Sequence, residues 1–168
     1  MNCDEEIYDV VNMDDRVIGK APRKEIHQKN LLHRSVHTFV FNPEGCLFLQ
    51  KRSLTKDENP GFWDTSSAGH VDSGEDYLTA ANRELTEELG ISEPLVPFMR
   101  IKACEESYWE HVAAYTCTTR KSIVINPAEI SEGRFWSLDE VRETLSKKND
   151  PFTSTFKIIF INYLKENR

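Results

Sequence analysis

The sequence predicts an α/β protein of the α+β class, in which a mixed β-sheet packs between helices. Two observations predict this class. Short apolar or alternating segments are separated by Gly, Pro and Asn turns, as in strands. Helical segments interrupt them without the regular strand–helix–strand rhythm of a parallel sheet. The 168 residues, 39% hydrophobic and 29% charged, suit one domain with one core.

The expected strands are identified by β-branched and aromatic residues between turn signals. A turn at residues 12–15 joins the first two strands, and Pro43-Glu44-Gly45 joins the next two. A polar loop, residues 53–62, follows the second pair. In chain order, the expected strands are the two within residues 7–20, then residues 35–42, 46–52, 98–104, 108–119 and 134–137.

The strongest expected helix spans residues 73–89. Ser73 is its expected cap, and Glu75 and Asp76 place negative charge in its first turn. Gly90 is the expected left-handed stop. Two further helices are expected, at residues 138–147 and 152–165. The apolar stripe of the first helix is Leu78, Ala81, Leu85 and Leu89.

Charge and composition exclude several classes of protein. The formal net charge of −7 argues against a partner that is a nucleic-acid polymer, because such proteins need a basic face. No stretch approaches the roughly 20 apolar residues that span a bilayer, so we expect no membrane partner. The acidic N-terminus does not resemble a secretory signal. The four cysteines form no metal-binding pattern and suit reduced thiols, which predicts a cytoplasmic protein.

The polar side of the first helix carries three clustered carboxylates. Glu84, Glu87 and Glu88 follow i, i+3, i+4 spacing, so Glu84 neighbours both of the others. Like charges at this spacing repel, and a divalent cation would relieve the repulsion. Mg²⁺ prefers oxygen ligands and keeps several waters, which a diphosphate can replace, and Mn²⁺ is the alternative ion. For these glutamates alone, a solvated acidic helix face is the competing interpretation.

The full spacing resolves this choice. Residues 69–91 place Gly69, Glu75, Arg83-Glu84-Leu85, Glu87-Glu88 and Gly90-Ile91 at fixed intervals. This pattern resembles the complete signature, or box, of the Nudix hydrolases, with every specified position filled. The resemblance implies the Nudix fold, an α/β/α sandwich with a mixed β-sheet, as a single domain over residues 1–168. It also implies cleavage of a diphosphate linked to another group with Mg²⁺ or Mn²⁺.

A wider resemblance links the chain to the isopentenyl diphosphate isomerases and their hydrolase relatives. It covers roughly residues 8–137. The isomerase cysteine is replaced by Ala68, which can neither donate nor accept the proton that double-bond migration needs. His33 and His70 match metal-binding histidines of that subgroup, and His27 lies near a third. The glutamate pair of the isomerases is represented by Glu110-His111, whose register stays open.

The resemblance implies roles for the box residues. Glu84, Glu87 and Glu88 are expected to hold the metal, with the carbonyl of Gly69 as a further ligand. Glu87 is the favoured proton acceptor. Arg83 is expected to orient an acid, with Glu75 as its partner. The alternative bases are Glu105, Glu106 and Glu110.

Three residues outside the glutamate cluster are expected to bind substrate. Arg52 and Lys56 align with cations that grip a diphosphate in the isomerase branch, and both residue types bind phosphate. The alternative is a surface pair flanking a loop. His70 is expected to be a hydrogen-bonding group beside the box. His33 and His37 are expected on a strand edge as ordinary histidines.

The predicted function is that of a magnesium-dependent hydrolase cleaving a phosphoanhydride bond in a small organic or nucleoside diphosphate derivative. Two alternatives are an isopentenyl diphosphate isomerase-like enzyme and a ligand-binding regulator of Nudix fold without turnover. The partner is therefore a small-molecule diphosphate, and its organic group stays open. Apolar residues of the last expected helix serve either a homodimer or the core.

Overall fold

The computed structural model describes residues 6–167. The strands are β1 (Ile7–Val11), β2 (Val17–Pro22), β3 (His33–Phe41), β4 (Leu47–Arg52), β5 (Trp63–Asp64), β6 (Ser67–His70), β7 (Val96–Ile101), β8 (Glu110–Thr118) and β9 (Ile130–Trp136). The helices are α1 (Arg23–Lys29), α2 (Tyr77–Leu89), α3 (Leu138–Leu145) and α4 (Ser154–Glu166).

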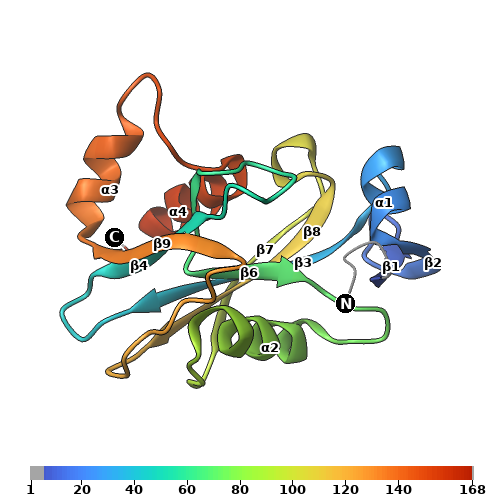
Figure 1. Ribbon diagram of the computed structural model, residues 1–168. Coiled ribbons are helices and arrows are strands. Elements are labelled where there is room, and N and C mark those ends of the chain that lie inside the picture. Colours follow the sequence, from blue (N-terminus) through green and yellow to red (C-terminus); the bar gives the residue numbers. More distant parts are fainter. Residues whose placement is uncertain (1–5, 168) are drawn as a thin grey trace.

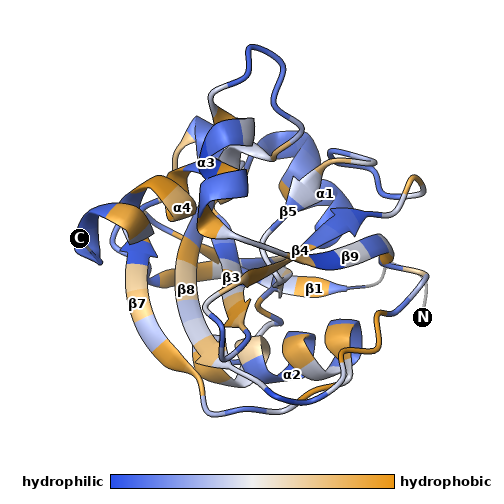
Figure 2. Ribbon diagram, turned by 90° about the vertical axis from the view of Figure 1, so that its left-hand side faces the viewer, coloured by the Kyte–Doolittle hydropathy of each residue, from blue (hydrophilic) through white to orange (hydrophobic). Residues whose placement is uncertain are grey.

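A mixed sheet lies between two helical layers, with α2 on one face and α3 and α4 on the other (Figure 1). Successive side chains of its central strand β3 point to opposite faces. Because helices cover both faces, β3 is buried on both sides. Phe39 packs in the cluster that contains Phe156 and Phe160 of α4. Val40 packs against Leu85 of α2. Apolar residues accordingly gather on the strands and on the inner sides of α2 and α4 (Figure 2).

The pairing of β3 positions the functional residues. β3 runs parallel to β8 and antiparallel to β4 and β6. β4 pairs with its last residues and β6 with residues 35–38, so two strands share one edge of β3. Ser66 lies where they separate. Its hydroxyl donates to the carbonyl of Phe48 and accepts from the amide of Val40, so it replaces backbone pairing there.

The box helix begins later than predicted. α2 starts at Tyr77, and its cap is Asp76, whose carboxylate accepts from the amide of Thr79. Ser73 instead donates to Asp9 of β1. The helix ends at Gly90 in the left-handed conformation (φ 65°), as predicted.

Three other predictions were wrong in detail. Leu78, assigned to the apolar stripe, is 47% exposed, because the shortened helix turns its first residues to solvent. His33 and His37 are buried in central strand β3, not on an edge. Helix α1 was missed, since it buries only Ile26 and has no side-chain cap.

Several remaining predictions can be read from the described residues. Cys46, Cys104 and Cys117 are free thiols, while Cys3 lies outside the described part of the chain. Phe156, Ile159 and Phe160 of the last helix pack in the core. Within residues 6–167, no helix has the length and apolar character to cross a membrane.

Candidate active site

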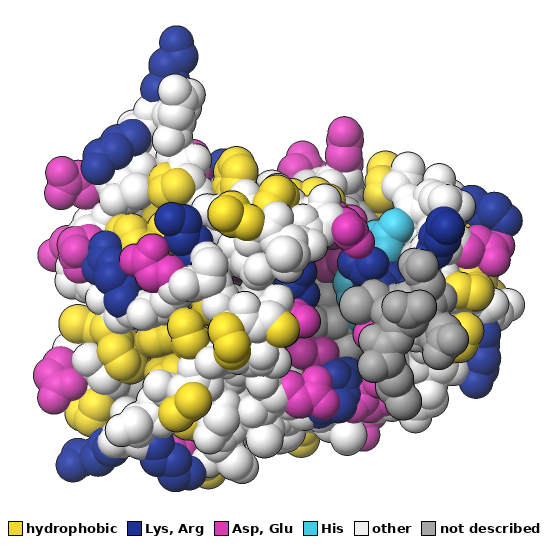
Figure 3. Space-filling view, in the orientation of Figure 1, with side chains coloured by type: hydrophobic (Ala, Val, Ile, Leu, Met, Phe, Trp, Pro, Cys, Tyr) yellow, Lys and Arg dark blue, Asp and Glu magenta, His cyan; other side chains and the backbone are white. Residues whose placement is uncertain are grey.

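A polar cleft of about 780 Å³ opens between β6, α2, the loop at residues 53–62 and α1. Acidic, basic and histidine side chains gather on this side of the molecule in Figure 3. We call two groups of residues the carboxylate end (Gly69, Glu84, Glu87 and Glu88) and the histidine end (His27, His33, His70 and Glu110). The carboxylate end, His70 and Glu110 line the cleft, whereas His27 and His33 line an adjoining pocket of about 340 Å³ that shares Glu58 with it. The two ends adjoin in the chain, because Gly69 precedes His70.

The carboxylate end is built by α2 packing under β6. Glu88 is only 5% exposed, and its Oε2 accepts from the amide of Ala68 (2.9 Å) and from Nε2 of Gln50 (3.1 Å). Burial raises the pKa of Glu88. Burial and then the neighbouring charge of Glu88 raise the pKa of Glu84. Glu87 is different, since its side chain is 59% exposed at the mouth of the cleft.

Gly69 is required by the approach of Glu84. A Cβ on Gly69 would overlap the carboxylate of Glu84. The absence of a side chain therefore lets a carboxylate lie directly against this backbone. The box glycine thus provides a cradle that any other residue would fill.

Arg83 organises the acids around the cleft. It binds Glu75 through two nitrogens, at 3.1 and 2.9 Å, which confirms the predicted contact. It also donates to Glu84 (2.6 Å) and to the carbonyl of His70 (3.0 Å). One guanidinium therefore fixes the box helix, the preceding loop and β6 relative to one another.

The two predicted phosphate-binding cations line the same cleft. Nε of Arg52 donates to the carbonyl of Glu58 (2.9 Å), and its guanidinium lies 3.7 Å from buried Asp64. Lys56 forms an ion pair with Glu129. Burial and then the charge of Arg52 lower the pKa of Lys56.

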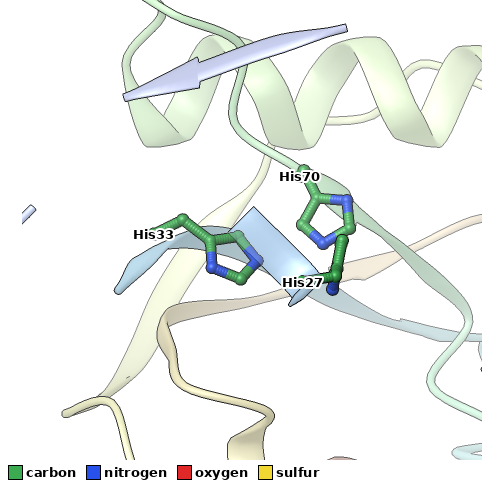
Figure 4. A group of neighbouring side chains, drawn as sticks. All are labelled: His27, His33 and His70. Atoms are coloured by element: carbon green, nitrogen blue, oxygen red, sulfur yellow. The ribbon is translucent and has the colours of Figure 1, made fainter. Parts of the chain in front are cut away.

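At the histidine end, three imidazole rings from three elements face a common centre (Figure 4). One nitrogen from each of His27, His33 and His70 can be chosen so that all three lie within 4.8 Å of one another. Nε2 of His27 is buried and has no hydrogen-bond partner among residues 6–167. Glu110 Oε1 lies 3.1 Å from Nε2 of His70 and 3.4 Å from Nε2 of His33.

This donor set fits a transition-metal ion. Although burial opposes ionisation, contacts with His33 and His70 hold the pKa of Glu110 well below its usual range. Burial lowers the pKa of His70, which favours the neutral ring that ligates metal. Burial alone would lower the pKa of His33, but the adjacent carboxylate of Glu110 raises it. Imidazole nitrogens beside a carboxylate suit Zn²⁺ or Fe²⁺ better than Mg²⁺. The buried, unpartnered Nε2 of His27 and the close approach of the three rings are the observations that support this fit.

Comparison with known proteins agrees with this geometry. The model of the NUDIX domain matches residues 31–156. The chain belongs to the NUDIX domain family. An isopentenyl-diphosphate delta-isomerase 2 from Photorhabdus laumondii is 34% identical over 160 residues, which cover 92% of this chain and 90% of that protein. An uncharacterized Nudix hydrolase from Pseudomonas aeruginosa is 35% identical over 133 residues, which cover 79% of each chain.

The fold agrees as well. A crystal structure of a Deinococcus radiodurans protein superposes with a TM-score of 0.80 at 24% identity, and covers 92% of this chain and 97% of that one. The predicted Nudix fold is therefore confirmed, and the chain is a Nudix hydrolase related to the isomerases. Its family supports a pyrophosphohydrolase-type function.

The Nudix site unites most of the residues that the sequence selected. Gly69, Arg83, the three box glutamates, Arg52, Lys56 and His70 all line the cleft. Among the alternative bases, Glu110 lines it, whereas Glu105 lines a neighbouring pocket of about 340 Å³. Glu106 appears in neither lining.

Two features of the Nudix site were not predicted. The sequence placed His27 only near a metal-binding position, and nothing local marks it as a member of a cluster. Glu58, whose Oε1 lies 3.1 Å from Nδ1 of His27, was not selected at all. An acidic residue in a polar loop gives no signal of its partner, because the partner lies 31 positions earlier in the chain.

Proposed function

We propose that this Nudix hydrolase splits the P–O–P linkage of a small organic diphosphate at the carboxylate end, with Mg²⁺ as its cofactor. The observation that carries the proposal is the convergence of Glu84 and Glu88 in a buried place beside Gly69. Burial raises the pKa of both carboxyls, the charge of Glu88 raises that of Glu84 further, and a divalent cation would offset this unfavourable negative charge. A protein without such a ligand would gain stability by replacing either of them.

Glu84, Glu87, Glu88 and the carbonyl of Gly69 would hold the Mg²⁺, for which Mn²⁺ is the alternative. Bound there, the ion supplies positive charge to the phosphate oxygens and favours ionisation of water. Arg83 holds Glu84 in place through its 2.6 Å contact. The carboxylate of Glu87 is exposed and lies 3.5 Å from Arg83, and we assign it the role of proton acceptor.

The cations and His70 supply the substrate contacts in this proposal. Arg52 and Lys56, which line the same cleft, pair with the diphosphate oxygens. His70 contributes a hydrogen bond near the scissile linkage. Water then attacks phosphorus in line, Glu87 takes its proton, and the bond to the bridging oxygen breaks so that one phosphate leaves with its group.

A substrate panel tests the proposal. The full chain is incubated with Mg²⁺ and nucleoside diphosphates and triphosphates, nucleotide sugars, dinucleotides and isoprenoid diphosphates, and products are identified by mass spectrometry. We expect saturable cleavage of at least one compound, lost with EDTA and restored by excess Mg²⁺. Binding without cleavage across the panel would instead support a regulator.

An isomerase-like activity is the second candidate, and the histidine end favours it. The relative from Photorhabdus laumondii is named an isomerase, and the histidine end includes three positions that match or neighbour its subgroup's metal ligands. Ala68 argues against this activity, since its methyl group cannot transfer a proton. Incubation with isopentenyl diphosphate, followed by a search for dimethylallyl diphosphate, separates the two candidates.

Contacts between the N-terminal elements and the central sheet support a single domain. His27 of α1 and Tyr8 of β1 lie against His33 and His70, so the N-terminal elements complete the cleft. A cytoplasmic location and a homodimer stay predictions.

A further inference from the structure

We infer that Glu58 is a positioning residue that orients His27 and so sets the transition-metal affinity of the histidine end. The inference rests on the fit of a transition-metal ion to the histidine end, which the donor set supports. It adds a residue from the loop at residues 53–62, which also carries the cation Lys56.

The two ring nitrogens of His27 have different surroundings. Glu58 Oε1 lies 3.1 Å from Nδ1, while Nε2 is buried without a partner. A carboxylate beside Nδ1 favours the tautomer with its proton there. The lone pair of Nε2 is then available at the centre of the cluster. This is the arrangement by which outer carboxylates orient metal-binding histidines.

His33 shows the same pattern with a different acceptor. Its Nδ1 lies 2.9 Å from the carbonyl of Leu31, and its buried Nε2 faces Glu110 Oε1 at 3.4 Å. Two rings therefore present the same nitrogen to the centre while an oxygen holds the other. For His33 the oxygen belongs to rigid backbone, but for His27 it belongs to a loop side chain.

Helix α1 depends on the loop at residues 53–62 for its placement. α1 has seven residues, no side-chain cap and one buried residue, Ile26. Two contacts join it to the loop: Asp57 pairs with Arg23 at 3.1 Å and Glu58 with His27. Arg23 and His27 are four positions apart, so both contacts fall on the same side of the helix.

Glu58 connects the histidine end to a cation of the cleft. The carbonyl of Glu58 accepts from Nε of Arg52, and its carboxylate contacts His27. One residue therefore touches a proposed diphosphate-binding cation through its backbone and a proposed metal ligand through its side chain. Loss of the carboxylate should act on the histidine end while the backbone contact to Arg52 remains.

The test uses Co²⁺ as the probe, with Mg²⁺ present to occupy the carboxylate end. Visible absorption of Co²⁺ bound to the full chain reports nitrogen ligation and affinity. We expect Glu58→Ala to weaken binding by about 10- to 100-fold. Glu58→Gln should lie between Ala and the wild type, because an amide oxygen still accepts from Nδ1 but lacks charge.

Two control variants isolate the effect. Glu25→Gln removes an exposed carboxylate of the same helix, which pairs with Lys29, and should leave Co²⁺ affinity unchanged. His27→Ala should weaken binding at least as much as Glu58→Ala. Histidine ¹⁵N spectra of the metal-free chain should show His27 protonated at Nδ1, with a shift toward the other tautomer in Glu58→Ala.

The outcomes separate failure of this inference from failure of the proposed function. Unchanged Co²⁺ affinity and His27 tautomer in Glu58→Ala, beside a loss in His27→Ala, would overturn the role of Glu58 alone. Unchanged affinity in His27→Ala would remove the metal from the histidine end altogether. Neither result touches Mg²⁺-dependent hydrolysis, which the substrate panel tests separately.

Discussion

The carboxylate end and the histidine end differ in the charges that surround their buried carboxyl groups. At the carboxylate end, Glu84 and Glu88 are like charges forced together, and burial raises the pKa of both. At the histidine end, three rings lie together, and contacts with two of them, His33 and His70, hold the pKa of Glu110 well below its usual range although burial opposes ionisation. One end keeps buried carboxylates at a raised pKa, and at the other the buried Nε2 of His27 has no hydrogen-bond partner among the described residues.

The difference indicates different ligands. Oxygen donors with excess negative charge suit Mg²⁺, while neutral nitrogen donors suit a transition metal. The ends also differ in support. The carboxylate end is fixed by helix α2 and by the four partners of Arg83, whereas His27 depends on a short helix and a loop. Substitutions at the two ends test this contrast.

Glu84→Gln should separate the two ends most strongly. The amide keeps the size of the side chain but removes its charge, so we expect at least about a hundredfold loss of kcat. Cleavage of the substrate found in the panel is measured with Mg²⁺, and Co²⁺ binding at the histidine end should persist. Glu44→Gln, in the exposed turn after β3, is the control. Wild-type turnover in Glu84→Gln would remove this residue from the site.

Gly69→Ala should reduce turnover by about 10- to 100-fold, because the new methyl group displaces the carboxylate of Glu84. Calorimetry should also show weaker Mg²⁺ binding. Gly19→Ala is a matched control, since its Cβ would meet nothing within 4 Å. Equal activity of the two alanine variants would show that the close approach at Gly69 has no functional consequence.

Lys56→Ala should act on substrate binding more than on chemistry. We expect KM to rise about tenfold with a smaller change in kcat, since a point charge contacts the diphosphate before and during reaction. Lys102→Ala, an exposed lysine outside the cleft lining, supplies the control. A fall in kcat at constant KM would assign Lys56 to the transition state instead.

The smallest effect concerns the stability of the metal-free chain. The pKa of Glu84 lies above the ordinary 4.5, so the folded state binds this proton more tightly than the unfolded state does. Stability is therefore greatest below the ordinary pKa and falls as pH rises through the raised one. Glu84→Gln should increase Tm by about 2–4 °C near pH 8 and by less near pH 5. A lower Tm at both pH values would contradict mutual repulsion of the acids.

Local features of the site were predictable because they depend on neighbours in sequence. The spacing of Glu84, Glu87 and Glu88 follows from helical periodicity, and Gly90 ends the helix as glycine usually does. The start of the helix was wrong because two capping residues, Ser73 and Asp76, compete locally. Contact of Ser73 with Asp9, distant in sequence, decides that competition.

The sequence by itself determined the family, the order of most elements and the acids on one helix face. Only the tertiary structure decided that His27, His33 and His70 meet, that Glu110 contacts the last two, and that Glu58 contacts the first. The physical reason is sheet register: β3 places Ser35 opposite His70 and His33 opposite Glu110. A register shift of one residue would turn these side chains to the other face, and no local pattern in the chain records that choice.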